Sequence, residues 1–323
     1  RGGGIVILDG GNGTELERRG VPMDPEAWCG VAALENGGAL EAIHRDYIAA
    51  GADVITANTY AASRLMLDLA GLAGQFAEVN RNAIEAAHRA RAASGRDDVL
   101  VAGSLSHQGP VVSGTDRPDL TRAASAAEMA DAFGELAQFL RDAGCDLILL
   151  EMMYYPERMA PAFEAAAASG LPVWAGFSVR RGEDGRVLSF APERDIPFQE
   201  TVQILAEFNV AAAGIMHTPA NVVGDALDIV GAVFDGPLLA YPDSGYFESP
   251  RWHFEGIIPP DKLHRYAAGW IENRVQIVGG CCGLSPAHIA ALAPFKGRKP
   301  PTKSSLPSNP SVREPNKPYA KDF

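Results

Sequence analysis

The feature that most restricts the fold of this 323-residue chain is an eightfold alternation of short apolar runs with amphipathic or alanine-rich segments. This alternation is typical of parallel β-strands that are joined by helices. The apolar runs predict strands at residues 5–9, 53–57, 99–104, 146–151, 173–178, 210–217, 237–241 and 275–279. Eight such units predict an α/β fold of one domain, a (β/α)₈ TIM barrel.

Helices are expected between these strands, at residues 39–50, 75–93, 125–143, 157–168, 196–208, 220–234, 260–272 and 286–293. Gly51, Gly144 and Gly170 each follow a helical stretch and precede a strand, where glycine can take the left-handed cap conformation. A doubly wound open sheet would also explain the alternation. The count of eight and the lack of a Gly-x-Gly-x-x-Gly turn after the first strand favour a closed barrel.

The last segment, residues 296–323, is rich in proline and lysine and has little apolar periodicity. We expect the barrel to occupy residues 1–295 and this segment to be an extended arm or a disordered tail. Such arms can lie across a neighbouring subunit, which would make the protein a homo-oligomer.

Charge and composition limit the partners and the compartment of the chain. Forty acidic and 28 basic residues give a net charge of −12, which argues against nucleic acid and anionic membranes as partners. No apolar run is long enough to span a bilayer, and the chain shows no secretory signal pattern. Four cysteines do not form the dense framework of a small secreted domain, so a cytoplasmic location is expected.

Two adjacent cysteines, Cys281 and Cys282, stand within the sequence Gly-Gly-Cys-Cys-Gly directly after the last predicted strand. A disulfide between neighbours would close a strained ring, so both thiols are expected to be free. Two free thiols side by side indicate a metal site or a reactive-sulfur site.

In a (β/α)₈ barrel the active site is formed at the carboxyl ends of the strands and in the loops that follow them. Catalytic zinc commonly has three protein ligands and one open position, and it favours thiolate and imidazole. Cys281 and Cys282 are therefore candidate Zn²⁺ ligands, and His217, at the end of the sixth strand, is the best-placed third ligand. Alternatively, the cysteines are small buried side chains and the histidine is structural. Other polar or small residues at the strand ends are Asp9, Gly10, Asn58, Glu151, Ser178 and Asp243.

Three segments carry a resemblance to a known family: Asp-Gly-Gly-Asn-Gly-Thr-Glu-Leu-Glu at 9–17, Gly-Ala-Asp-Val-Ile-Thr-Ala-Asn-Thr-Tyr at 51–60, and the cysteine loop at 279–283 with Ser285 and Pro286. With these motifs in this order, the chain resembles the homocysteine S-methyltransferase family from residue 5 to about 294. The resemblance implies a zinc barrel that transfers a methyl group from a small sulfonium or betaine-type donor to the zinc-bound thiolate of homocysteine, giving methionine, or to a related thiol.

The same resemblance implies that Glu151 pairs with the substrate amino group and that Asp9 and Gly10 line the amino-acid pocket. Glu151 also ends an apolar strand and so needs a partner, which could instead be a structural salt bridge. Asp9 could simply brace the Gly-rich loop. Asn58, Ser178 and Asp243 are further candidates for substrate binding. Aromatic rings bind methylated cations, and the candidates for the donor site are Trp28, Tyr60, Tyr154, Phe247 and Trp252.

The chain departs from the family pattern at the expected metal site. Met216 and His217 replace an Asn-Cys pair, and Asp243 replaces an asparagine. Imidazole in place of a thiolate leaves the zinc site one unit less negative, so a bound thiolate should be held more tightly and react more slowly, or the substrate differs. Two other functions stay open: a zinc hydrolase or lyase with Asp243 or Glu151 as base, and a non-catalytic zinc- or amino-acid-binding protein.

Overall fold

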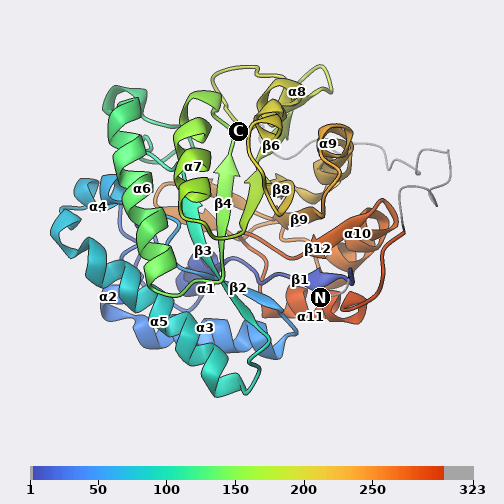
Figure 1. The fold of residues 1–323 in the computed structure, drawn as a ribbon, viewed down its shortest axis with the longest axis horizontal. Helices are drawn as coiled ribbons and strands as arrows, with labels where there is room; N and C mark the ends of the chain where they lie inside the picture. The colour runs from blue at the N-terminus through green and yellow to red at the C-terminus, as the bar shows by residue number, and fades with distance from the viewer. Residues whose placement is uncertain (1–2, 302–323) are drawn as a thin grey trace.

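A computed structural model describes residues 3–301, in which eight parallel strands form a barrel surrounded by helices (Figure 1). The strands are β1 (Val6–Ile7), β2 (Val54–Ala57), β3 (Leu100–Ser106), β4 (Leu147–Met153), β5 (Val173–Phe177), β8 (Ala212–Pro219), β9 (Leu238–Asp243) and β12 (Val275–Val278). Their order is β1-β12-β9-β8-β5-β4-β3-β2. A parallel bridge between Leu8 and Val54 joins the two outer strands. The predicted barrel is therefore confirmed.

The strands are apolar along nearly their whole length because both of their faces are covered, one by helices and the other by the barrel interior. The outer helices include α3 (Gly37–Ala49), α5 (Phe76–Ser94), α6 (Ala126–Asp142), α7 (Pro156–Ala168), α9 (Ala220–Val233), α10 (Pro260–Glu272) and α11 (Pro286–Leu292). Helix α6 shows how the sequence sets this layer: Phe133, Leu136 and Leu140 recur at helical spacing and are buried. Ser125 and Glu128 form a capping box that starts the helix.

The predicted glycine caps are confirmed. Gly51, Gly144 and Gly170 have φ angles of 112°, 84° and 78°, in the left-handed region that side chains other than glycine rarely adopt. Each glycine turns the chain from a helix into the next strand, which fixes the spacing of the repeating units.

The helix predicted at 196–208 is wrong in its form. The chain there makes a short α8 (Phe198–Thr201) followed by a 3₁₀ helix, η3 (Val202–Ala206). Pro197 has an extended backbone and disfavours a helical conformation at Ile196, so the helix cannot begin earlier. The strand predicted at 210–217 lies two residues further on, as β8.

The long loops at the carboxyl end of the barrel contain elements that the alternation did not predict. A hairpin of β6 (Val179–Arg181) and β7 (Val187–Ser189) follows β5, and a hairpin of β10 (Tyr246–Glu248) and β11 (Arg251–His253) follows β9. Short helices α1 (Asn12–Arg18), α2 (Ala32–Glu35) and α4 (Arg64–Leu69) and 3₁₀ turns η1 (Ala73–Gln75), η2 (Leu120–Arg122) and η4 (Ala293–Phe295) fill other connections.

The chain after the barrel is described only to residue 301, so most of the predicted arm or tail, residues 302–323, lies outside the described residues. Its first residues run beside the start of β1. The Ile5 amide donates to the Arg298 carbonyl at 2.7 Å, and the Gly297 amide donates to the Ile5 carbonyl at 2.9 Å. Among the described helices, none combines the length and the apolar character needed to cross a membrane.

Candidate metal centre and substrate cavity

A cavity of about 770 Å³ lies at the carboxyl ends of the barrel strands. Eight of the nine site residues proposed from the sequence line it, because closure of the barrel brings the ends of separate strands together. These eight are Asp9, Gly10, Asn58, Glu151, His217, Asp243, Cys281 and Cys282.

The cysteine loop after β12 is held against the end of β9 by two backbone hydrogen bonds. The Cys281 amide donates to the Pro242 carbonyl at 2.7 Å, and the Ser244 amide donates to the Cys282 carbonyl at 2.9 Å. Gly283 follows with a φ of 78°, and a Cβ atom there would lie 1.8 Å from the Ser244 oxygen. Glycine is therefore required for the loop to approach β9 this closely.

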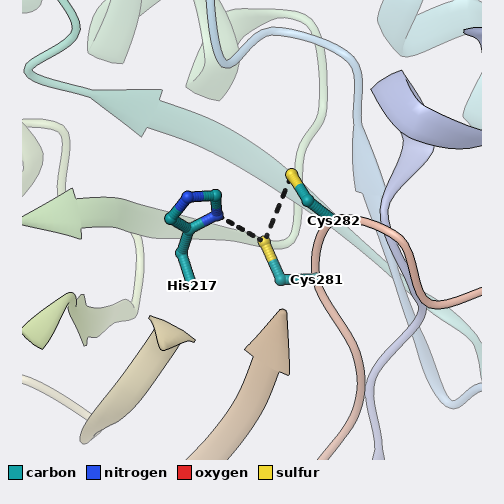
Figure 2. A group of neighbouring side chains, drawn as sticks. All are labelled: His217, Cys281 and Cys282. Atoms are coloured by element: carbon teal, nitrogen blue, oxygen red, sulfur yellow. Dashed lines mark hydrogen bonds between the residues drawn. The ribbon is translucent and has the colours of Figure 1, made fainter. Parts of the chain in front are cut away.

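The side chains of Cys281, Cys282 and His217 converge at one point of the cavity wall (Figure 2). The Cys281 Sγ atom lies 3.7 Å from His217 Nδ1 and 3.9 Å from Cys282 Sγ, and all three candidate ligand atoms lie within 4.8 Å of one another. A tetrahedral zinc with bonds of about 2.0–2.3 Å separates its ligands by roughly 3.5 Å. Both the donor types and the spacing therefore fit zinc.

His217 has a φ of 42°, which is unusual for a residue with a side chain. Its ring is packed edge-on between Phe190 and Trp252, at centroid distances of 5.6 and 5.7 Å. Its second nitrogen, Nε2, lies 3.7 Å from an oxygen of Asp243. A carboxylate beside the outer nitrogen of a ligand histidine is a common way to orient the ring and to make it more basic.

The pKa values of the three candidate ligands are all raised, which favours their protonated forms at neutral pH. Burial alone would lower the pKa of His217, but Asp243 and Cys281 outweigh burial and raise it to about 9. The hydrogen bond with Cys282, together with burial, raises the pKa of the Cys281 thiol well above its usual range. A metal ion that binds here must therefore displace protons from these groups.

Two buried carboxyl groups, Asp9 and Glu151, line the same cavity. Burial raises the pKa of each to about 7. Glu151 accepts a hydrogen bond from the Ser104 hydroxyl. Among the described residues no basic nitrogen lies within 4.0 Å of its carboxylate oxygens, so Glu151 forms no structural salt bridge with them. Asp9 accepts from the amide and hydroxyl of Thr56 at 2.7 and 2.9 Å, so it braces β2 rather than the Gly-rich loop.

The remaining candidates for substrate binding differ in their placement. Gly10 packs so closely on the Leu284 carbonyl that a Cβ atom would lie 2.5 Å from its oxygen. Asn58 donates to the Cys29 carbonyl at 2.7 Å and lines the cavity. Ser178 is fully buried and donates to the Met216 sulfur at 3.1 Å, and it is absent from the cavity wall.

All five aromatic residues proposed for the donor site line the cavity. Trp28 meets Tyr60 and Phe247 edge-on, at centroid distances of 6.4 and 5.7 Å, and Phe247 lies 6.5 Å from Trp252. These rings form a continuous aromatic wall that could surround a methylated cation.

The sequence interpretation missed cavity residues on the β6–β7 hairpin and on α7. Phe190, Arg180 and Arg181 reach the cavity because the hairpin follows β5 directly. The sequence Asp184-Gly185 was the available signal, since Asp-Gly pairs favour tight hairpin turns. Arg158 of α7 also lines the cavity, and no sequence pattern marks it.

Comparisons with known proteins show which family has this sequence and fold. A family model described as homocysteine S-methyltransferase matches residues 6–295. The chain is 30% identical to homocysteine S-methyltransferase of Escherichia coli, over 89% of this chain and 94% of that protein. It is 27% identical to selenocysteine Se-methyltransferase of Brassica oleracea var. italica, over 90% and 88% of the two chains. The metallated crystal structure of the homocysteine methyltransferase MmuM from Escherichia coli matches with a TM-score of 0.71, at 26% identity, over 90% of this chain and 96% of that chain. This chain belongs to the homocysteine S-methyltransferase family.

Proposed function

We propose that this protein is a zinc-dependent S-methyltransferase that moves a methyl group from a small sulfonium or betaine-type donor to the sulfur of homocysteine, giving methionine, or of a related thiol. The observation that carries the proposal is the convergence of His217, Cys281 and Cys282 within 4.8 Å on the wall of a cavity of about 770 Å³. Three soft or borderline ligands leave one tetrahedral position for a substrate atom.

The ligand set explains why a metal is needed for a thiol acceptor. A free thiol has a pKa of about 8.5 and is mostly protonated at neutral pH. Zinc held by these three residues would bind the acceptor sulfur and favour its thiolate form. The imidazole of His217 carries no negative charge, so the site is less negative than one made of three thiolates.

The protein side chains then supply binding and orientation. Glu151, which has no basic partner among the described residues, would pair with the amino group of the acceptor, and Asp9 and Gly10 would line the same pocket. The aromatic wall would hold the donor cation. During transfer the bond from the methyl carbon to the donor sulfur or nitrogen breaks, its electron pair stays on the neutral leaving group, and the acceptor sulfur forms the new bond. No acid is needed, so the protein must chiefly align donor and acceptor.

Substitution of one candidate metal ligand tests this function. We expect Cys281→Ser to lose bound zinc and methyl transfer to homocysteine, both measured on the same preparation. Cys145→Ala is the matched control, because Cys145 is also a buried free cysteine but lies outside the cavity wall. Full activity of Cys281→Ser without metal would refute the proposal, and hydrolysis in the absence of any thiol would favour a zinc hydrolase instead.

A further inference from the structure

Arg158 is a buried cation at the cavity, and none of the acidic side chains in residues 3–301 pairs with it. It lies in the first turn of α7, is 7% exposed and lines the cavity. Within residues 3–301, no carboxylate oxygen lies within 4.0 Å of its guanidinium, and no hydrogen-bond acceptor is found for it. The other two arginines of the wall are paired: Arg180 with Asp195 at 2.6 Å, and Arg181 with Asp225 at 2.5 Å.

The position of Arg158 is unfavourable for the protein alone. An arginine cannot lose its proton in a protein, so burial leaves a full charge out of water. The first turn of a helix carries partial positive charge, which repels a cation and attracts an anion. Both effects would be offset by an anionic ligand that enters the cavity.

The guanidinium of Arg158 packs on an aromatic ring and next to a glycine, at the wall of the cavity. Its guanidinium carbon lies 4.8 Å from the centre of the Tyr155 ring, an arrangement that leaves N–H groups at the guanidinium edge. Gly109 lies next to it, and a Cβ atom at that residue would lie 3.1 Å from Arg158 Nη1. The planar fork of arginine matches the two oxygens of a carboxylate.

Arg158 is separated from the candidate metal ligands by a row of aromatic rings. Tyr155 lies 4.5 Å from Tyr154, Tyr154 lies 5.5 Å from Phe190, and Phe190 lies 5.6 Å from His217, measured between ring centres. An acceptor held by its sulfur at the metal ligands and by its amino group at Glu151 carries its own carboxylate on the carbon that bears the amino group. That carboxylate would lie beside Glu151, close to the metal ligands rather than beyond the row of rings. The anion at Arg158 is therefore assigned to the second substrate.

We propose that Arg158 binds the carboxylate of a zwitterionic methyl donor, whose onium group lies against the aromatic residues of the cavity. This inference rests on the proposed methyltransferase function and adds to it the residue that would recognise the carboxylate end of the donor. Arg158 would then be a specificity residue: it would favour such donors over methylated cations of similar size without an anionic end.

Two pairs of probes test the inference on the zinc-loaded full chain: dimethylsulfoniopropionate with its amide, and glycine betaine with its amide. In each pair the amide keeps the methylated cation and removes only the carboxylate charge. Calorimetry without homocysteine gives the affinity of each probe, and methyl-transfer assays with homocysteine give KM and kcat. We expect at least one carboxylate probe to bind at least about tenfold more tightly than its amide, because a charge-assisted hydrogen bond is stronger than a neutral one.

Variants assign that preference to Arg158. We expect Arg158→Met to bind the carboxylate probe and its amide with nearly equal affinity, because the carboxylate probe loses affinity and its KM rises. The affinity for homocysteine should be unchanged. Arg158→Lys, which keeps the charge but not the fork, should reduce the ratio several-fold and serves if the Met variant does not fold. Arg181→Met is the control, since Arg181 lines the same cavity but is paired, and it should keep the wild-type ratio.

Three outcomes would overturn the inference: no binding of either carboxylate probe, an equal loss for acid and amide in Arg158→Met, or a loss of homocysteine affinity with the probe ratio intact. Binding with the expected ratio but no methyl transfer would instead count against the proposed function, while the assignment of Arg158 would stand.

Discussion

Asp9 both braces a neighbouring strand and lines the cavity. Its carboxyl group is 2% exposed and is bonded to Thr56, yet burial raises its pKa to about 7. The motif at residues 9–17 predicted a place in the pocket, and the cavity wall includes Asp9. The hydrogen bond from the Thr56 amide to Asp9 joins two residues 47 positions apart, and a single sequence does not reveal such a contact. Ser178 points away from the cavity wall for a similar reason, because the direction of a side chain at the end of a strand depends on the neighbouring strand.

The raised pKa of Asp9 predicts a pH dependence of stability. An unfolded aspartate titrates near 3.8 and the folded one near 7, so the folded state binds the extra proton between these values. The contribution of Asp9 to stability is therefore greatest below about pH 4 and declines as the pH rises through 7, by about 1.4 kcal/mol for each pH unit between the two pKa values.

Asp9→Asn isolates this effect, because an amide can accept from the Thr56 amide and donate to its hydroxyl. We expect the free energy of unfolding of this variant to change less between pH 5 and pH 8 than that of the wild type, as measured by urea denaturation. Asp97→Asn, at an exposed position, is the matched control and should follow the wild type. A decline in Asp9→Asn as steep as in the wild type would contradict the assignment.

At the scale of elements, the eight strands and most helices followed from periodicity, because each unit buries its own apolar face against the barrel. The two hairpins did not, since they are set by local turns within loops rather than by a repeating pattern. The helix expected at 196–208 failed because one residue, Pro197, controls where it can start. The cysteine loop after β12 was predictable from its two cysteines. The approach of Asp243 to His217 was not, because it depends on the pairing of β8 with β9.

The cysteine loop also allows a prediction at this scale. Gly283→Ala would place a methyl group 1.8 Å from the Ser244 oxygen at a φ of 78°, so the loop must move away from β9. We expect weaker zinc binding in a competition assay with a chelator, and a loss of stability of more than about 2 kcal/mol.

Gly185→Ala separates the effect of the close contact with Ser244 from the effect of the left-handed backbone. Gly185 has a φ of 82° but no atom within 4 Å of the added Cβ, so Gly185→Ala has the same backbone strain as Gly283→Ala without the close contact. This control should lose about 1–2 kcal/mol and keep its zinc affinity. Equal zinc affinity in the two variants would show that close packing of the loop does not position Cys281 and Cys282.

At the scale of the whole molecule, closure of the barrel explains why the site draws on the full length of the chain. β1 pairs with β12, so Asp9 and the cysteine loop lie on neighbouring strands although about 270 residues separate them in sequence. The family resemblance and the count of strands predicted this arrangement. That no acid among residues 3–301 pairs with Arg158 could not be predicted, because only the packed structure shows which acids each arginine reaches.

We infer that His217, Cys281 and Cys282 hold a zinc ion with one position open to the acceptor sulfur. X-ray absorption at the zinc edge tests it most directly, because it counts the sulfur atoms bound to the metal. We predict two sulfur ligands per zinc in the protein alone and three after homocysteine is added. A sulfur count that does not change with homocysteine, or zinc bound without any sulfur, would contradict the account.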